Sequence, residues 1–127
     1  MRCFICTFNM IKFGIPADAA KQIIQFSRVQ NSMIEKENNE VFISIPALFK
    51  QYSEEYHGLI LKMDVSEVKK IILLTPKIEM EIEIPDNSIH SLPKLFSGPF
   101  IYFNGVFFND NNPVFIINTE KLIGCVK

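Results

Sequence analysis

The sequence of 127 residues contains no tryptophan, only five glycines and three cysteines, and its charges nearly balance. Thirteen lysines and arginines stand against 14 aspartates and glutamates, without the basic stripe that a phosphate backbone attracts. The few glycines form neither a phosphate-binding loop nor a dinucleotide fingerprint. We therefore expect no nucleic acid partner and no cofactor.

Long apolar runs are also absent, and none approaches the ~20 residues that a membrane-spanning helix needs. The three cysteines are an odd number, and the start of the chain does not have the pattern of a secretion signal. We expect a reduced, cytoplasmic protein without membrane insertion. The length is typical of one domain, so we expect a single domain over residues 1–127, with subdomain boundaries left open.

Residues that carry chemistry are few and isolated. Cys3 and Cys6 have the spacing of zinc and redox sites, but in a strand residues three apart point to opposite faces. His57 and His90 each lack a second ligand or catalytic partner at a suitable spacing. The sequence predicts no catalytic residues, no metal site and no enzyme.

What the chain does contain is apolar strand sequence, with 12 phenylalanines and abundant isoleucine. Alternation and turn residues predict a mainly β fold with two short helical turns, and favour a barrel or paired barrels over a parallel sheet. The Ala-rich segment 17–24, which follows Pro16, predicts one helix of about two turns. The expected strands cover 4–8, 11–15, 41–45, 57–63, 71–74, 78–84, 96–109 and 114–117.

Two of these strands have distinct patterns. Ile71 to Leu74 is apolar on both faces, which predicts a central strand. Ile78 to Ile84 alternates apolar and acidic residues, so we expect Ile82 to be buried and the glutamates of this strand to face water. Those glutamates could also form an acidic patch that meets a basic partner.

The end of the chain is the most informative segment. An apolar strand runs to Asn109, a polar turn follows over 109–112, and a second strand ends at Asn118 before a short helical tail. This order resembles the C-terminal end of the CheW-like domain family. The resemblance extends over most of the chain, including the Phe13 to Pro16 step and the segment Val41 to Phe49.

The resemblance implies a pair of small five-stranded β-barrels that share a core. It also implies a non-enzymatic adaptor in bacterial chemosensory signalling, which binds the regulatory domain of a CheA-type histidine kinase and the tip of a chemoreceptor. Apolar residues of the first helical turn, Ala20, Ile23 and Ile24, are the candidates for a binding groove between the barrels. An alternative interpretation is that Ile23 and Ile24 close the core.

The chain departs from the family at one turn. Where the family has an Arg-Gly turn, this chain has Lys36-Glu37-Asn38-Asn39. Lys36, Asn38 and Asn39 are therefore candidate binding residues, and the loss of arginine predicts weak coupling to receptors, because lysine is only a flexible point charge. A second hypothesis is a small β-barrel that binds a small apolar ligand in its mouth.

Overall fold

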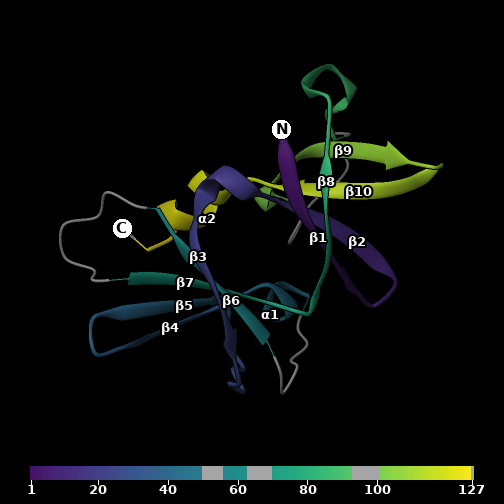
Figure 1. The fold of residues 1–127 in the computed structure, drawn as a ribbon. Coiled ribbons are helices and arrows are strands. Elements are labelled where there is room, and N and C mark those ends of the chain that lie inside the picture. The colour runs from purple at the N-terminus through teal and green to yellow at the C-terminus, as the bar shows by residue number, and fades with distance from the viewer. Residues whose placement is uncertain (50–55, 63–69, 93–100, 127) are drawn as a thin grey trace.

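The structure, a computed structural model, describes residues 1–49, 56–62, 70–92 and 101–126. Ten strands and four short helices cover most of this part of the chain (Figure 1). The strands are β1 (Arg2–Phe8), β2 (Ile11–Pro16), β3 (Ala20–Phe26), β4 (Ile34–Glu37), β5 (Glu40–Ser44), β6 (Tyr56–Leu61), β7 (Lys70–Thr75), β8 (Ile78–Glu83), β9 (Phe103–Asn109) and β10 (Asn112–Ile117). The helices are η1 (Ala17–Ala19), α1 (Ile45–Leu48), η2 (Asp86–Ser88) and α2 (Thr119–Gly124).

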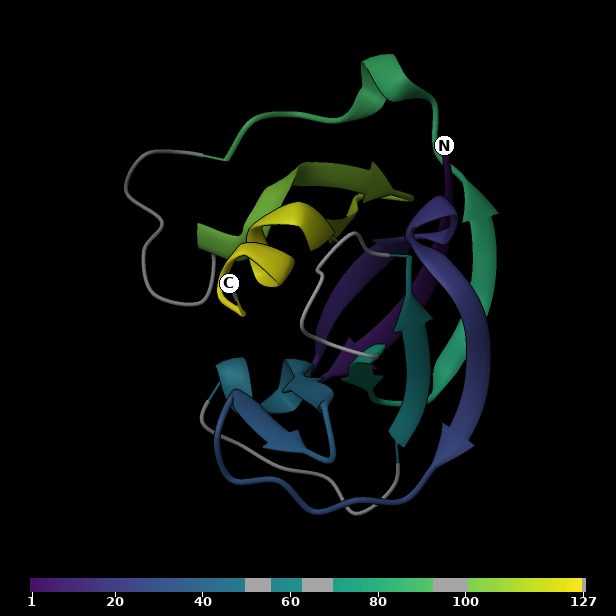
Figure 2. The same ribbon diagram turned by 90° about the vertical axis from the view of Figure 1, so that its left-hand side faces the viewer.

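The strands form two five-stranded sheets, which confirms the mainly β prediction. The first sheet has the order β8-β1-β2-β10-β9, and the second has the order β3-β6-β7-β5-β4. Each sheet contains one parallel pair, β2 with β10 and β5 with β7, and its other pairs are antiparallel. Figure 2 shows the chain passing between the two strongly curved sheets, which do not close into complete barrels.

Alternation along the strands places apolar side chains on both faces of each sheet, which produces three clusters. The central cluster lies where the sheets meet and takes Phe13 and Ile15 from the first sheet and Leu59 and Leu73 from the second. Two smaller clusters lie on the opposite faces. They contain Cys3, Ile5, Ile84, Val114 and Ile116 in the first sheet, and Phe42, Ile72 and Leu74 in the second. The sheets thus share a core, and each fully buried aliphatic side chain contributes about 1.5–3 kcal/mol.

The remaining predictions of local structure are confirmed at several points. β7 occupies the middle of its sheet and is buried on both faces. The helical tail is α2, whose N-cap Asn118 accepts a hydrogen bond from the Lys121 amide at 3.1 Å. The strands expected over 4–8 and 11–15 are β1 and β2, which pair as a hairpin that reverses at Asn9 and Met10.

The predicted helix over 17–24 is wrong. Only Ala17–Ala19 forms a single 3₁₀ turn, and Ala20, Ile23 and Ile24 lie on β3, paired with β6. The alanines favour a helix locally, but pairing with β6 lets the two adjacent isoleucines contact both faces of the second sheet. Tertiary packing overrides a propensity that sums to little over so short a segment.

The predicted burial of β8 is only partly correct. Its glutamates are exposed as expected, and Ile84 just beyond it is fully buried. Ile82, however, is only half-buried, and Met80 is 48% exposed. β8 is an edge strand, so its apolar face has a neighbouring strand on one side only.

Parts of two predicted strands lie outside the described residues. These are Met63, at the end of the strand expected over 57–63, and residues 96–100, at the start of the strand expected over 96–109; the segment 63–69 between two expected strands is also not described. Among the described residues, no helix is long and apolar enough to span a membrane.

Candidate protein-binding site

The three apolar candidates lie together on β3, but they do not share one face. Ile23 pairs with Leu59, whose side chain belongs to the central cluster, and Ala20 also packs against that cluster. Ile24 pairs with Gly58 and points to the opposite face. A β-carbon at Gly58 would lie 3.1 Å from Cγ1 of Ile24, so the absence of a side chain there makes room for Ile24.

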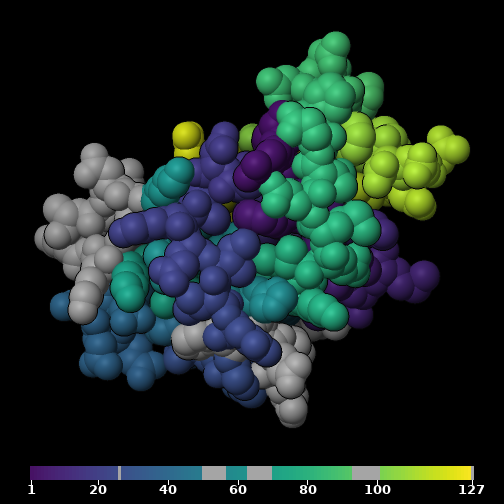
Figure 3. Space-filling view, in the orientation of Figure 1, coloured from purple at the N-terminus to yellow at the C-terminus, as the bar shows by residue number. Residues whose placement is uncertain are grey.

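Exposure separates these candidates further. Ala20 and Ile24 are half-buried, whereas Ile23 is 43% exposed. Ile23 therefore extends the apolar central cluster to the surface along an edge strand of the second sheet. In Figure 3, β3 lies on the front face of the molecule, and atoms of β1 are visible between it and β8. The interpretation that Ile23 simply closes the core is not supported, but it remains valid for Ile24.

The polar candidates lie at the opposite edge of the second sheet, on the β4–β5 hairpin. Asn38 and Asn39 form its two-residue turn with φ values of 52° and 64°. Asparagine tolerates this left-handed conformation better than most residues, which explains why the amide pair stands there. Lys36 is exposed and pairs with Val41.

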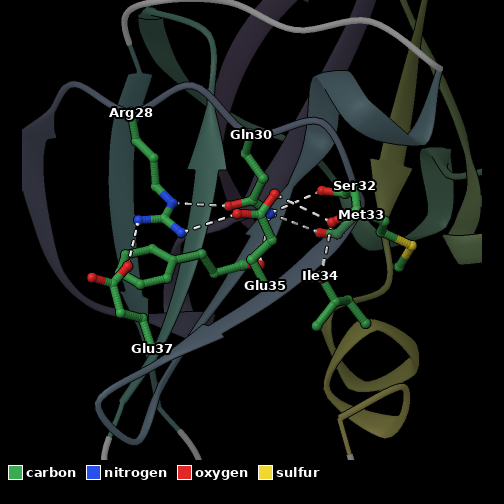
Figure 4. Close-up of polar contacts among 8 residues, drawn as sticks. Arg28, Gln30, Ser32, Met33, Ile34, Glu35 and Glu37 are labelled. Atoms are coloured by element: carbon green, nitrogen blue, oxygen red, sulfur yellow. Dashed lines mark hydrogen bonds and ion pairs between the residues drawn. The ribbon is translucent and has the colours of Figure 1, made fainter.

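Sequence reasoning did not identify Arg28, although this residue follows β3 at one edge of the second sheet and contacts the β4–β5 hairpin at the other edge. It lies in the segment between β3 and β4, and its guanidinium reaches the hairpin. Nη2 is 3.2 Å from Glu35 Oε1 and Nη1 is 3.0 Å from Glu37 Oε2 (Figure 4). The guanidinium carbon also lies 4.1 Å from the centroid of the Phe42 ring. Arginine matches such a set because its planar fork can pair with two carboxylates and stack on a ring.

Gln30 fixes the same segment from the inside. Its side chain is 1% exposed, and Oε1 accepts a hydrogen bond from Arg28 Nε at 3.1 Å. Its amide nitrogen donates to the carbonyl oxygens of Ser32, Met33 and Phe42 at 3.0, 3.2 and 2.9 Å. We call Arg28, Gln30, Glu35, Glu37 and Phe42 the hairpin clamp. A lone arginine and a lone glutamine in a polar segment carried no periodic signal that could have revealed it.

The thiols have the arrangement that their spacing predicted. Cys3 belongs to the apolar cluster of the first sheet and Cys6 to the central cluster, on opposite faces of β1. Burial raises the pKa of Cys3 to about 11 and that of Cys6 to about 12. Among the described residues, no three His, Cys, Asp or Glu side chains are grouped to hold a metal ion.

Both histidines have structural contacts. Nδ1 of His57 accepts a hydrogen bond from the Ile78 amide at 2.9 Å, where the chain passes from the second sheet to the first. The His90 ring lies 5.8 Å from the Phe108 ring, between centroids.

Two of the three glutamates of β8 form ion pairs with residues at the start of the chain. Glu81 contacts Arg2 at 2.7 Å and Glu83 contacts the amino terminus at 3.0 Å. The surface is acidic here, but two of its three carboxylates already have cationic neighbours.

The described surface includes two hollows beside strand turns. One of about 160 Å³ is lined by Arg28, Phe42 and the hairpin residues Glu37, Asn38 and Glu40. The other, of about 150 Å³, lies beside Met10 and Phe115. Both are smaller than the ~300 Å³ at which small-molecule sites begin, so these two hollows suit a side chain of another protein better than a small ligand.

Comparison with known proteins supports the fold. The structure is similar to the crystal structure of the scaffolding protein TtCheW from Thermoanaerobacter tengcongensis, with a TM-score of 0.72 and 16% sequence identity. The likeness covers 91% of this chain and 82% of that chain. No family model and no curated protein matches the sequence.

Proposed function

We propose that this chain is a non-enzymatic scaffold of a bacterial chemosensory system that binds the regulatory domain of a CheA-type histidine kinase. The observation that carries the proposal is the likeness in fold to a scaffolding protein over 91% of the chain. The small hollows and the isolated polar residues of the described surface agree with binding of a protein rather than with catalysis.

The kinase contact is assigned to the β3 edge. Ile23 is the apolar anchor because it is 43% exposed and continues the central cluster. Interfaces are built around such half-exposed apolar residues, which become desolvated when the partner docks. Ala20 provides a small, half-buried neighbour on the same side, and Ile24 supports the strand from the opposite face.

A chemoreceptor tip is the second proposed partner, bound through Lys36 and the Asn38-Asn39 turn. We propose that this contact is weak. Lys36 is the only cationic residue of the hairpin, while the Arg28 guanidinium is already paired with Glu35 and Glu37. A receptor carboxylate would have to displace one of these pairs to reach the planar fork of the arginine.

We further propose that residues 1–127 form one domain, because the central cluster takes side chains from both sheets. Separate unfolding of either sheet would expose that cluster. A single calorimetric transition is expected, and two resolved transitions would contradict it.

The experiment is a calorimetric titration of the purified chain with the regulatory domain of its CheA-type kinase. We expect binding that Ile23→Glu abolishes, because the substitution places a charge in a desolvated contact. The matched control is Gln22→Glu, which introduces the same charge one residue earlier on the opposite, exposed face. No binding at tens of micromolar would reject the scaffold, and equal effects of the two variants would reject β3 as the contact.

A further inference from the structure

Met10 occupies a backbone position that does not suit its side chain. In the part of the chain that the structure describes, six non-glycine residues have positive φ, and five of them are asparagine or aspartate, which tolerate this conformation. The exception is Met10, with φ of 65° in the β1–β2 turn. Its side chain is also 96% exposed, so burial does not offset the strain. Backbone strain at a residue that does not stabilise the fold indicates that the residue has another role, such as binding.

The surface next to Met10 is hollow and largely apolar. β2 and β10 run parallel, with Lys12 opposite Val114, so the β1–β2 and β9–β10 turns lie at the same end of the first sheet. A hollow of about 150 Å³ lies between them, lined by Met10, Ile11, Lys12, Asn112, Pro113 and Phe115. Both turns project from the right-hand side in Figures 1 and 3, opposite the β4–β5 hairpin.

The size of the hollow limits what can enter it. A cavity of about 150 Å³ can accommodate one benzene molecule, so there is room for one apolar side chain. Most small-molecule ligands need more volume. Met10, whose unbranched side chain adapts to irregular surfaces, can close over an inserted group.

The charge of the hollow favours one kind of partner. Lys12 is the only ionisable residue that lines it, and within the described part of the chain no carboxylate lies within ion-pair distance of Lys12. One cation is too few for a nucleic acid but is sufficient to select a carboxylate beside the inserted side chain.

We propose that the Met10 hollow is a third docking site, and that it takes an apolar side chain flanked by carboxylates from a partner protein. The site lies on the first sheet, at the far end from the β4–β5 hairpin, and is independent of the contact assigned to β3. A partner bound here leaves the second sheet accessible, so the chain can bind it together with the partners proposed for β3 and the β4–β5 hairpin.

The test is nuclear magnetic resonance of the labelled full-length chain with two peptides at millimolar concentration. The probes are acetyl-Glu-Leu-Glu-amide and its basic counterpart, acetyl-Lys-Leu-Lys-amide. The acidic peptide is expected to shift the Met10 methyl and the Ile11 and Phe115 amide signals, and to bind roughly fivefold more tightly than the basic one.

Two variants and one control separate binding from folding. Met10→Gly should lose the peptide without lowering the unfolding midpoint, since Asn-Gly suits this turn better. Lys12→Glu should reverse the preference between the peptides, and Lys62→Glu, at an exposed site just after β6 of the second sheet, should not. Equal binding of both peptides, shifts elsewhere, or no shift would overturn the proposal. Signals that move with protein concentration alone would assign the hollow to a second copy of the chain, which also overturns it.

Discussion

The Arg28 guanidinium lies over the Phe42 ring, with 4.1 Å between the guanidinium carbon and the ring centroid. Phe42 comes from β5, and Arg28 from the segment that leaves β3, so this contact fixes that segment across the edge of the second sheet. The same guanidinium pairs with two glutamates of β4. One side chain thus ties the segment that leaves β3 to both strands of the β4–β5 hairpin.

Removal of Arg28 should therefore loosen the hairpin clamp. We expect Arg28→Ala to lower the free energy of unfolding by about 1–2 kcal/mol, from a stacking contact and two partly exposed ion pairs. The loss should shrink in high salt, and urea titration at two salt concentrations measures both effects. Arg2→Ala, which removes the exposed pair with Glu81, is the control and should cost less than about 0.5 kcal/mol. Similar losses for the two variants would contradict the clamp.

The strand pattern of this chain predicted more of its fold than did the composition of short segments. Each turn with positive φ separates two strands, and the Asn38-Asn39 and Asp110-Asn111 pairs were readable from residue type. The helix predicted over 17–24 failed because Ala20 and its neighbours are held by β6, which is distant in sequence. Local propensity contains no information about such a partner.

The binding surface was less predictable, because it depends on which strands form the sheet edges. Alternation in β8 predicted which residues share a face, but it could not reveal that an edge would leave Met80 exposed. Arg28 and Glu37 are nine residues apart and meet only because the intervening segment folds back. Met10 occupies a turn position with positive φ, which the residue type of methionine does not predict.

The exposure gradient along β8 gives a second prediction. Substitution by aspartate should lower the free energy of unfolding most at Ile84, which is fully buried, less at the half-buried Ile82, and least at Met80. We expect losses of several kcal/mol at Ile84 and below about 1 kcal/mol at Met80. Urea unfolding midpoints measure the series, with Glu81→Lys as a surface control. A uniform loss across the three positions would show that the strand is not at an edge.

The thiols should differ in reactivity. Cys3 and Cys6 are buried and their pKa values are raised to about 11 and 12, so at pH 8 both stay protonated and shielded. Cys125 is exposed. An aromatic disulfide reagent should therefore label one thiol rapidly in the native protein and three after unfolding.

Cys125→Ser is the control for this assignment and should eliminate the rapid phase. Elemental analysis should find no stoichiometric zinc, because Cys3 and Cys6 face opposite sides of β1. Rapid labelling of a second thiol, or one zinc per chain, would contradict the arrangement of these cysteines.

Two glycines should respond in opposite ways to alanine. A β-carbon at Gly105 would overlap the carbonyl oxygen of His90, which pairs with Val106 in a backbone bridge. Gly105→Ala should therefore destabilise the protein by about 1–3 kcal/mol. Gly124, at the end of α2, has nothing within 4 Å of an added β-carbon, so Gly124→Ala should be neutral or stabilise by up to about 1 kcal/mol. Thermal unfolding of both variants tests the pair, and losses of equal size would be inconsistent with this packing.

The β4–β5 hairpin allows a direct test of weak receptor coupling. An arginine at Asn38 would be strained, since φ is 52° there. At Lys36 the same side chain sits on an exposed strand position, on the opposite face from Glu35 and Glu37, so it should not compete with Arg28 for them. Asn39→Gly fits the left-handed turn position without strain. The double variant Lys36→Arg with Asn39→Gly therefore introduces an arginine and a glycine into the hairpin without disturbing the clamp.

We expect this variant to raise kinase phosphorylation in reconstituted receptor membranes several-fold over the wild type, because arginine can pair with a receptor carboxylate through two hydrogen bonds and lysine cannot. The matched control is Lys77→Arg, the same exchange at an exposed position outside the hairpin, which should leave phosphorylation unchanged. Full kinase activation by the wild type would preserve the scaffold proposal but refute weak coupling. If instead both variants activate equally, the hairpin is not the receptor contact.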